Sequence, residues 1–129
     1  MKERRHALIA GDAEALIGVL EVEPGGIRSR RIFAGPGASV VRLSLAGGEV
    51  LKEHIAMAPL LLQMLAGRAE ITVAGDRVEL SAGGLLHIDA QVPHAVEALE
   101  DAQVMLVLLG AKPARQPRPE PVPSPLISA

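Results

Sequence analysis

The sequence contains no cysteine, no tryptophan and no tyrosine, and Phe33 is its one phenylalanine. The lack of cysteine excludes disulfides, thiolate metal ligands and cysteine nucleophiles. The lack of ring faces removes the surfaces on which nucleic-acid bases or quaternary ammonium groups stack. Charge is nearly balanced, with 13 Lys and Arg against 15 Asp and Glu, so no basic surface is available to neutralise phosphates. We therefore expect no nucleic-acid partner and a binding surface made of aliphatic walls.

Long apolar runs are missing as well. The stretches at 60–66 and 104–109 are far shorter than the roughly 20 residues that span a bilayer. The basic N-terminus imitates a secretory signal, but Asp12 and Glu14 interrupt the apolar run that follows and no small-residue cleavage pattern appears. The sequence predicts a cytoplasmic protein that makes no membrane contact.

Glycine and proline divide most of the chain into short apolar segments, for example at 35–37, 46–48 and 75–76. This punctuation predicts an all-β sandwich or barrel. The expected strands are 27–33, 39–45, 50–55, 60–66, 69–74, 77–80, 85–88, 94–98 and 103–109. Before them, Asp12 is a plausible N-cap for a short helix that runs through Leu20.

With 129 residues, 49% of them hydrophobic, the chain can bury one core. We expect three parts: an N-terminal segment with the helix at 1–26, a β-barrel at 27–111, and a proline-rich tail at 112–129. In the tail, prolines occupy every second position from Pro117 to Pro125, which prevents sheet pairing. We expect a disordered tail of polyproline II character. A proline-motif ligand is the alternative, although the spacing never gives PxxP.

Two glycine-bracketed segments carry histidines at regular spacing. In the first, Gly48 is followed after five residues by His54, and then by Ala56, Leu60 and Gly67. This spacing resembles the first cupin motif, in which a glycine, two histidines, a glutamate and a glycine stand at these five positions. Ala56 replaces the second histidine of that motif, and Leu60 replaces its glutamate.

The second segment runs from Gly83 to Ala98 and resembles the second cupin motif. Its leading Gly83 and its histidine, His94, are present, whereas Asp89, Gln91 and Ala98 stand where the motif has proline, glycine and asparagine. The resemblance implies a small single-domain, RmlC-like cupin. Its fold would be a double-stranded β-helix, the jelly-roll barrel.

The resemblance also implies where a metal would bind. Cupins place three histidines and a glutamate around an ion inside the barrel, and histidines two apart on a strand share one face. This chain keeps only His54 and His94 of the four, and two neutral imidazoles without an anionic ligand hold a divalent ion weakly. Any metal, whether Zn, Ni, Mn, Fe or Cu, is therefore expected to bind weakly. His87 is a candidate third ligand, although it faces outward if Leu86 and Ile88 face the core.

Replacing the carboxylate by Leu60 turns an ion site into an apolar one, with Leu62 and Met64 beside it. We expect a ligand pocket with imidazoles above an apolar floor, lined by His54, Ala56, Leu60, Leu62, Met64 and His94. A barrel filled by its own side chains is the alternative.

The sequence leaves three functions open. The first is a barrel that binds a small molecule without catalysis, and the second is a metal-dependent oxygenase or isomerase using His54, His94 and a non-standard third ligand. A purely structural or interaction role is the third. The His and Tyr acid–base pair of cupin epimerases cannot be carried over because the chain has no tyrosine, and no reaction type follows. The resemblance further implies a homodimer.

Arginines cluster at the start of the expected barrel, at positions 28, 30 and 31. At a barrel mouth, Arg28, Arg30 and Arg31 would contact an anionic ligand. On an edge strand, they would form a solvated or subunit-contacting face instead.

Overall fold

The computed structural model describes residues 5–110 and contains one short helix and a series of antiparallel strands. Their bounds are α1 (Ala13–Gly18), β1 (Ile27–Gly35), β2 (Ala38–Leu45), β3 (Val50–His54), β4 (Leu60–Ala66), β5 (Arg68–Val73), β6 (Asp76–Ser81), β7 (Leu85–Ile88), β8 (His94–Ala98) and β9 (Ala102–Leu109). Each expected strand is present, with ends shifted by at most two residues. Residue 111 and the expected tail at 112–129 lie outside the described residues.

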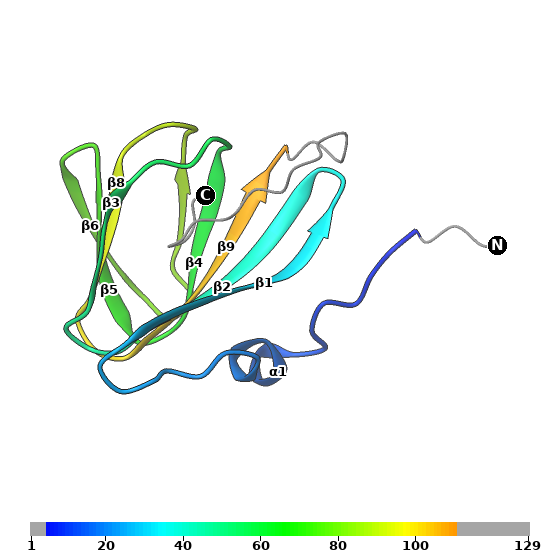
Figure 1. Ribbon diagram of the computed structural model, residues 1–129, viewed down its shortest axis with the longest axis horizontal. Coiled ribbons are helices and arrows are strands. Elements are labelled where there is room, and N and C mark those ends of the chain that lie inside the picture. Colours follow the sequence, from blue (N-terminus) through cyan, green and yellow to red (C-terminus); the bar gives the residue numbers. More distant parts are fainter. Residues whose placement is uncertain (1–4, 111–129) are drawn as a thin grey trace.

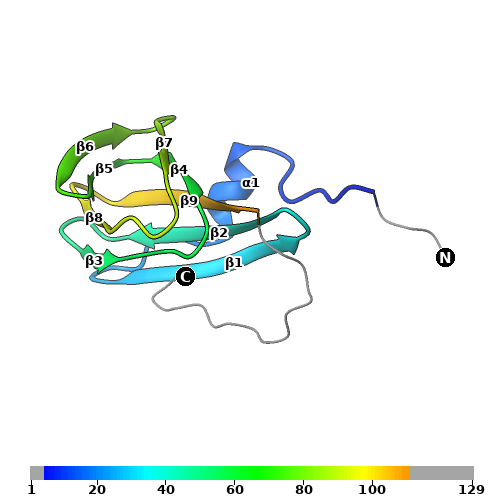
Figure 2. The same ribbon diagram turned by 90° about the horizontal axis from the view of Figure 1, so that it is seen from above.

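The strands form two antiparallel sheets that face each other (Figure 1). One sheet has the order β1-β2-β9-β4-β7, and the other has the order β3-β8-β5-β6. Seen from above, the strands β3 and β8 of one sheet lie on the same side of the barrel as β1 and β2 of the other (Figure 2). This arrangement confirms the predicted all-β jelly-roll. Among the described residues, no helix has the length and apolar character needed to cross a membrane.

The space between the sheets is filled by aliphatic side chains. Along β4, Leu60, Leu62 and Met64 are buried while the residues between them are partly exposed, which is the alternation of a strand with one face on a core. Ile71 of β5 and Val96 of β8 meet them from the other sheet. The barrel interior thus contains the apolar side chains that the composition predicted.

Helix α1 begins as expected but ends early. The Asp12 side chain caps it by accepting a hydrogen bond from the Ala15 amide at 2.8 Å. The helix ends at Gly18, not Leu20, and no residue within it is buried. It lies against the outside of the five-stranded sheet (Figure 2). Because six residues cannot form a stable helix alone, contacts with the sheet must hold it.

Arg42 of β2 supplies those contacts. Its side chain is fully buried on the outer face of the sheet. The guanidinium donates hydrogen bonds to the Gln103 side chain and to five backbone carbonyls, those of Leu16, Ile17, Leu20, Leu43 and Val104. Three of these carbonyls belong to the end of α1 and the turn after it, where a helix leaves its acceptors unpaired. Arg42 therefore fixes the N-terminal segment to the sheet, and β2 is buried on both faces.

Candidate functional site

The structure brings two of the predicted site residues together. His54, the last residue of β3, is the direct cross-strand partner of His94, the first residue of β8. Their ring centroids are 4.4 Å apart and the ring planes are tilted by 60°. His94 is 4% exposed, whereas His54 is partly exposed. The pair forms one feature at the end of the four-stranded sheet.

An irregularity in β3 turns His54 toward the barrel interior. Leu51 pairs with buried Val96, and the next described pair is His54 with His94. Three steps along β3 therefore match two steps along β8, which is the register of a β-bulge. Without the extra residue, strand alternation would place Leu51 and His54 on opposite faces. The bulge places both beside the inward-facing residues of β8.

The two rings are held in the same way. His54 Nδ1 lies 2.9 Å from the carbonyl oxygen of Lys52, and His94 Nδ1 lies 2.9 Å from that of Val92. A carbonyl oxygen only accepts, so each Nδ1 must carry the proton and donate it. In the neutral ring, Nε2 is then an acceptor with a free lone pair. Neither Nε2 has a hydrogen-bond partner among residues 5–110, and in His94 this atom belongs to a buried side chain.

Burial also sets the charge state of His94. Desolvation lowers its pKa below 6.5, and the neighbouring His54 lowers it further. The hydrogen bond to Val92 and the charge of Glu53 act in the opposite direction, but burial is the largest cause. His94 is therefore neutral at pH 7, which leaves its Nε2 able to accept a hydrogen bond.

The remaining predicted pocket residues belong to the apolar core of the barrel. Ala56 follows His54 by two residues and is buried, and Leu60, Leu62 and Met64 belong to the same core cluster. Ala56 is fixed through its carbonyl, which accepts from the Gln91 amide at 2.7 Å. This contact joins the β3–β4 loop to the β7–β8 loop beside the two histidines.

His87 lies apart from the pair. It belongs to β7, in the other sheet, and pairs with Leu61 across to β4. Its side chain is half exposed, and its Nδ1 lies 3.8 Å from a carboxylate oxygen of Asp89. Ile88 beside it is buried, so His87 is on the outer face, as the alternation predicted.

The donor set does not fit a resident four-ligand metal. Within the part of the chain that the structure describes, no three His, Asp or Glu side chains are close enough together to share an ion. The pair offers two imidazole nitrogens and no negative charge, whereas catalytic zinc sites use three protein ligands. What this arrangement can do is accept two hydrogen bonds, or give two ligands to an ion whose other ligands come from elsewhere.

The three arginines of β1 are divided between the faces of the sheet. Arg28 and Arg30 lie on the outer face and donate to the carbonyls of Glu21 and Val19, at 3.0 and 3.2 Å. Arg31 pairs with Val41, a core residue, and therefore lies on the barrel-facing side of an edge strand. Arg28 and Arg30 thus help Arg42 to hold the N-terminal segment. Sequence reasoning missed Arg42, because a single arginine within an apolar strand resembles an exposed position.

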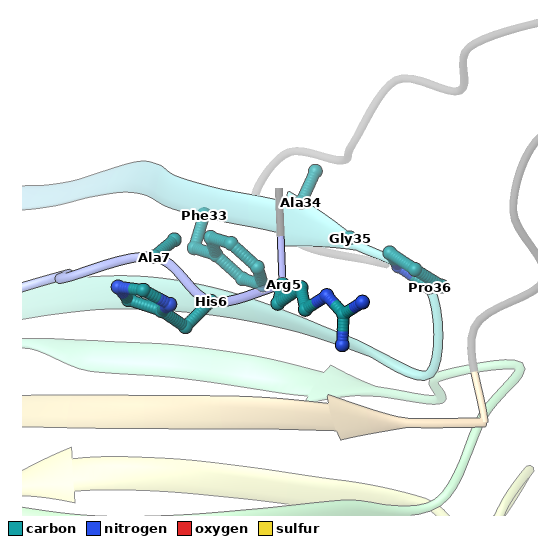
Figure 3. Close-up of a pocket in the computed structure, with 7 residues that line it drawn as sticks. All are labelled: Arg5, His6, Ala7, Phe33, Ala34, Gly35 and Pro36. Atoms are coloured by element: carbon teal, nitrogen blue, oxygen red, sulfur yellow. The ribbon is translucent and has the colours of Figure 1, made fainter. Parts of the chain in front are cut away.

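A cavity of about 560 Å³ lies between the N-terminal segment and the end of β1 (Figure 3). It is lined by Arg5, His6, Ala7, Phe33, Ala34, Gly35 and Pro36. The cavity shares no residue with the imidazole pair, and Arg5 and His6 on its rim are exposed. It is an opening beside a terminal segment, so we place the candidate site at the histidines.

Comparisons with known proteins agree with the fold. The sequence profile of the family described as "Cupin domain" matches residues 41–110, which is more than half of the chain. No curated protein matches the sequence.

Solved structures give close matches in shape. A conserved protein of unknown function from Streptococcus pyogenes is similar with a TM-score of 0.70 and 22% identity, over 85% of this chain and 94% of that one. A cupin superfamily protein from Desulfitobacterium hafniense is similar with a TM-score of 0.69 and 21% sequence identity, over 74% of this chain and 88% of that one. A cupin 2 conserved barrel domain protein from Leptotrichia buccalis is similar with a TM-score of 0.69 and 30% sequence identity, over 74% of this chain and 46% of that one.

Proposed function

The chain belongs to the cupin domain family, and on this basis we propose that its barrel binds a small organic molecule through the imidazoles of His54 and His94. The observation that carries the proposal is the pair of Nε2 atoms, for which residues 5–110 provide no hydrogen-bond partner. Buried polar atoms in folded proteins are nearly always hydrogen-bonded, so an unpaired one beside a second acceptor suggests a missing partner. A small molecule that donates hydrogen bonds would supply it.

The surroundings favour an organic ligand over a bare ion. Ala56 and Leu60 replace the polar groups that would stabilise a divalent charge, and both are part of the apolar core cluster. Binding sites for small molecules combine apolar walls with a few fixed polar groups. The imidazoles are such groups, because their Nδ1 atoms are anchored to the backbone and their orientation is set before a ligand arrives.

A binding screen tests this proposal. Small hydrogen-bond donors would be screened by ligand-observed NMR against the wild-type protein and the variants His54→Ala and His94→Ala. His87→Ala is the matched control, because it removes an imidazole on the outer face. We expect binding that is lost in the first two variants and kept in the control. The proposal would be contradicted if the wild-type protein bound none of the compounds, or if the compounds bound His54→Ala and His94→Ala as tightly as the wild type.

One observation favours a second function, that of a metal-dependent oxygenase or isomerase. Ligating histidines usually donate their second ring nitrogen to a carbonyl or carboxylate, which is how both rings are held here. A Zn, Ni, Mn, Fe or Cu ion bound through both Nε2 atoms would need a third ligand from the substrate or solvent, and it would supply Lewis acidity or redox chemistry. Elemental analysis of protein purified without an affinity tag tests this alternative. Stoichiometric metal that disappears in His94→Ala and persists in His87→Ala would favour it over the first proposal.

Homodimerisation, a cytoplasmic location and the absence of nucleic-acid and membrane partners remain predictions from the sequence. We propose the dimer because small cupins commonly pair. Light scattering on the purified chain would test it directly.

A further inference from the structure

A buried hydroxyl near the start of β2 has no hydrogen-bond partner among the described residues. Ser39 is 7% exposed, and its side chain makes no hydrogen bond with the residues that the structure describes. Ser44 on the same strand differs, since its hydroxyl donates to the Glu21 carbonyl at 3.2 Å. Burying a hydroxyl without a hydrogen bond costs free energy. Ser39 therefore has an unmet bonding capacity that Ser44 lacks.

Register shows which way Ser39 faces. It pairs with Leu108 of β9, Leu108 pairs with Leu60 of β4, and Leu60 pairs with Ile88 of β7. Directly paired residues in antiparallel strands point to the same side of a sheet. Leu60 and Ile88 are 2% and 1% exposed and belong to the barrel core. Ser39 therefore faces the barrel interior, whereas Ser44 faces outward under the N-terminal segment.

The row of laterally paired residues Ser39, Leu108, Leu60 and Ile88 lies at the same end of the barrel as His54 and His94. Five residues connect His54 to Leu60, and five connect Ile88 to His94. Both loops therefore connect the Ser39 row to His54 and His94 at one end of the barrel. The end of β9 lies there too, because the Leu109 amide donates to the Pro59 carbonyl, in the loop between His54 and Leu60, at 2.9 Å.

Ser39 and the histidines also share one side of the barrel. β2 lies opposite β3 and β8 when the two sheets are seen from above (Figure 2). Facing sheets are about 10 Å apart, and an imidazole extends across much of that gap. The Ser39 hydroxyl and the histidine pair therefore face the same end of the barrel interior from opposite sheets.

We propose that Ser39 is a specificity-determining residue of this site and that the ligand is a vicinal diol with an apolar flank. The inference rests on the proposed function. Two adjacent hydroxyl groups would each donate to one Nε2, and the Ser39 hydroxyl would donate to one of their oxygens. The carbon skeleton of the ligand would pack against Leu60 and Leu108.

The test compares cis-cyclohexane-1,2-diol with cyclohexanol, which has the same ring and one hydroxyl fewer. Affinities would be measured by NMR titration for the wild-type protein, Ser39→Ala and Ser44→Ala. Since one hydrogen bond contributes about 0.5–1.5 kcal/mol, we expect the wild type to prefer the diol by about three- to tenfold. Ser39→Ala should lose most of its affinity for the diol, whereas Ser44→Ala should keep it.

Stability separates a binding role from a structural one. Ser39→Ala removes an unpaired hydroxyl and should leave the free energy of unfolding unchanged or higher, whereas Ser44→Ala should lower it. Ser39→Ala protein that is destabilised, or that keeps the wild-type preference for the diol, would overturn the role of Ser39. A wild-type protein that binds neither probe, or that binds both equally, would overturn the proposal that the ligand is a vicinal diol. Diol binding that survives both His54→Ala and His94→Ala would instead overturn the proposed function.

Discussion

His54 and His94 are direct cross-strand partners whose ring centroids are 4.4 Å apart, and each ring is anchored to the backbone carbonyl two residues before it. The anchors come from Lys52 in one strand and Val92 in the loop before the other. Because both Nδ1 atoms are occupied in this way, both Nε2 atoms remain as acceptors. The geometry of the pair is therefore set by the local backbone and needs no ligand to form.

Restoring the replaced motif residues should create a metal site. We expect the double variant Ala56→His, Leu60→Glu to bind a divalent transition metal more tightly than the wild type, because it combines three imidazoles with a carboxylate. Without metal, the buried glutamate should destabilise the barrel, and metal should recover the loss. Elemental analysis and thermal denaturation with and without Zn²⁺ would measure both effects.

The single variant Ala56→His is the matched control for this experiment. It adds an imidazole but no charge, so it should bind metal more weakly than the double variant. If the wild type and the double variant bind metal equally, then Ala56 and Leu60 do not weaken metal binding at this site.

Stability should depend on the protonation of His94. Burial lowers the pKa of His94 in the folded protein below its unfolded value of 6.5. The unfolded chain therefore binds more protons between these two values, and stability must rise with pH in that window. The contribution of His94 is complete above pH 6.5 and is lost as the pH falls through the folded pKa.

Urea denaturation at a series of pH values would measure this dependence. The slope below pH 6.5 should be smaller in His94→Gln than in the wild type. Equal slopes in the wild type and His94→Gln would show that His94 does not titrate as a buried group.

Arg42 should be the most important charged residue for stability. Burial lowers its pKa to about 10, so it stays protonated at neutral pH, and its replacement leaves several carbonyls unpaired. We expect Arg42→Met to lower the free energy of unfolding by about 2–4 kcal/mol. Arg30→Met removes one exposed hydrogen bond and should cost under about 1 kcal/mol. Hydrogen exchange at residues 13–21 should speed up in Arg42→Met alone, and protection that persists there would contradict the role of Arg42.

Gly67 should not tolerate a side chain. Its φ is +82°, and a Cβ atom would lie 2.0 Å from the carbonyl oxygen of Asp101. We expect Gly67→Ala to cost about 3 kcal/mol or more, because a clash with backbone adds to the strain of the left-handed conformation. Gly75 also has a positive φ, +90°, but has no atom within 4 Å of its Cβ position. Gly75→Ala should therefore cost only about 1–2 kcal/mol, and equal losses in chemical denaturation would refute the argument.

Most of the fold could be predicted from the sequence because its signals are local. Turn residues such as Gly75 and Asp76 mark strand ends, and the alternation of Leu60, Leu62 and Met64 marks a strand with one buried face. The outward direction of His87 followed from the same reasoning. Such features depend on near neighbours alone, so a sequence without structural context contains them.

The features that define the site depend on distant contacts. The bulge that turns His54 inward is a mismatch between β3 and β8, and no residue type in Leu51–His54 announces it. Arg42 is buried because α1 covers the same outer face of the sheet and offers carbonyls to it. Ser39 faces the interior through pairing with β9. Each of these facts needs the tertiary arrangement.

We propose that His54 and His94 present to a ligand two Nε2 acceptors that are unpaired among residues 5–110. Long-range ¹H–¹⁵N NMR of the imidazole rings at pH 7.5 tests it most directly, because it identifies the protonated nitrogen of each ring. We expect the Nδ1–H tautomer for both residues, with Nε2 signals that shift when cis-cyclohexane-1,2-diol binds. A proton on Nε2 of either ring would contradict it.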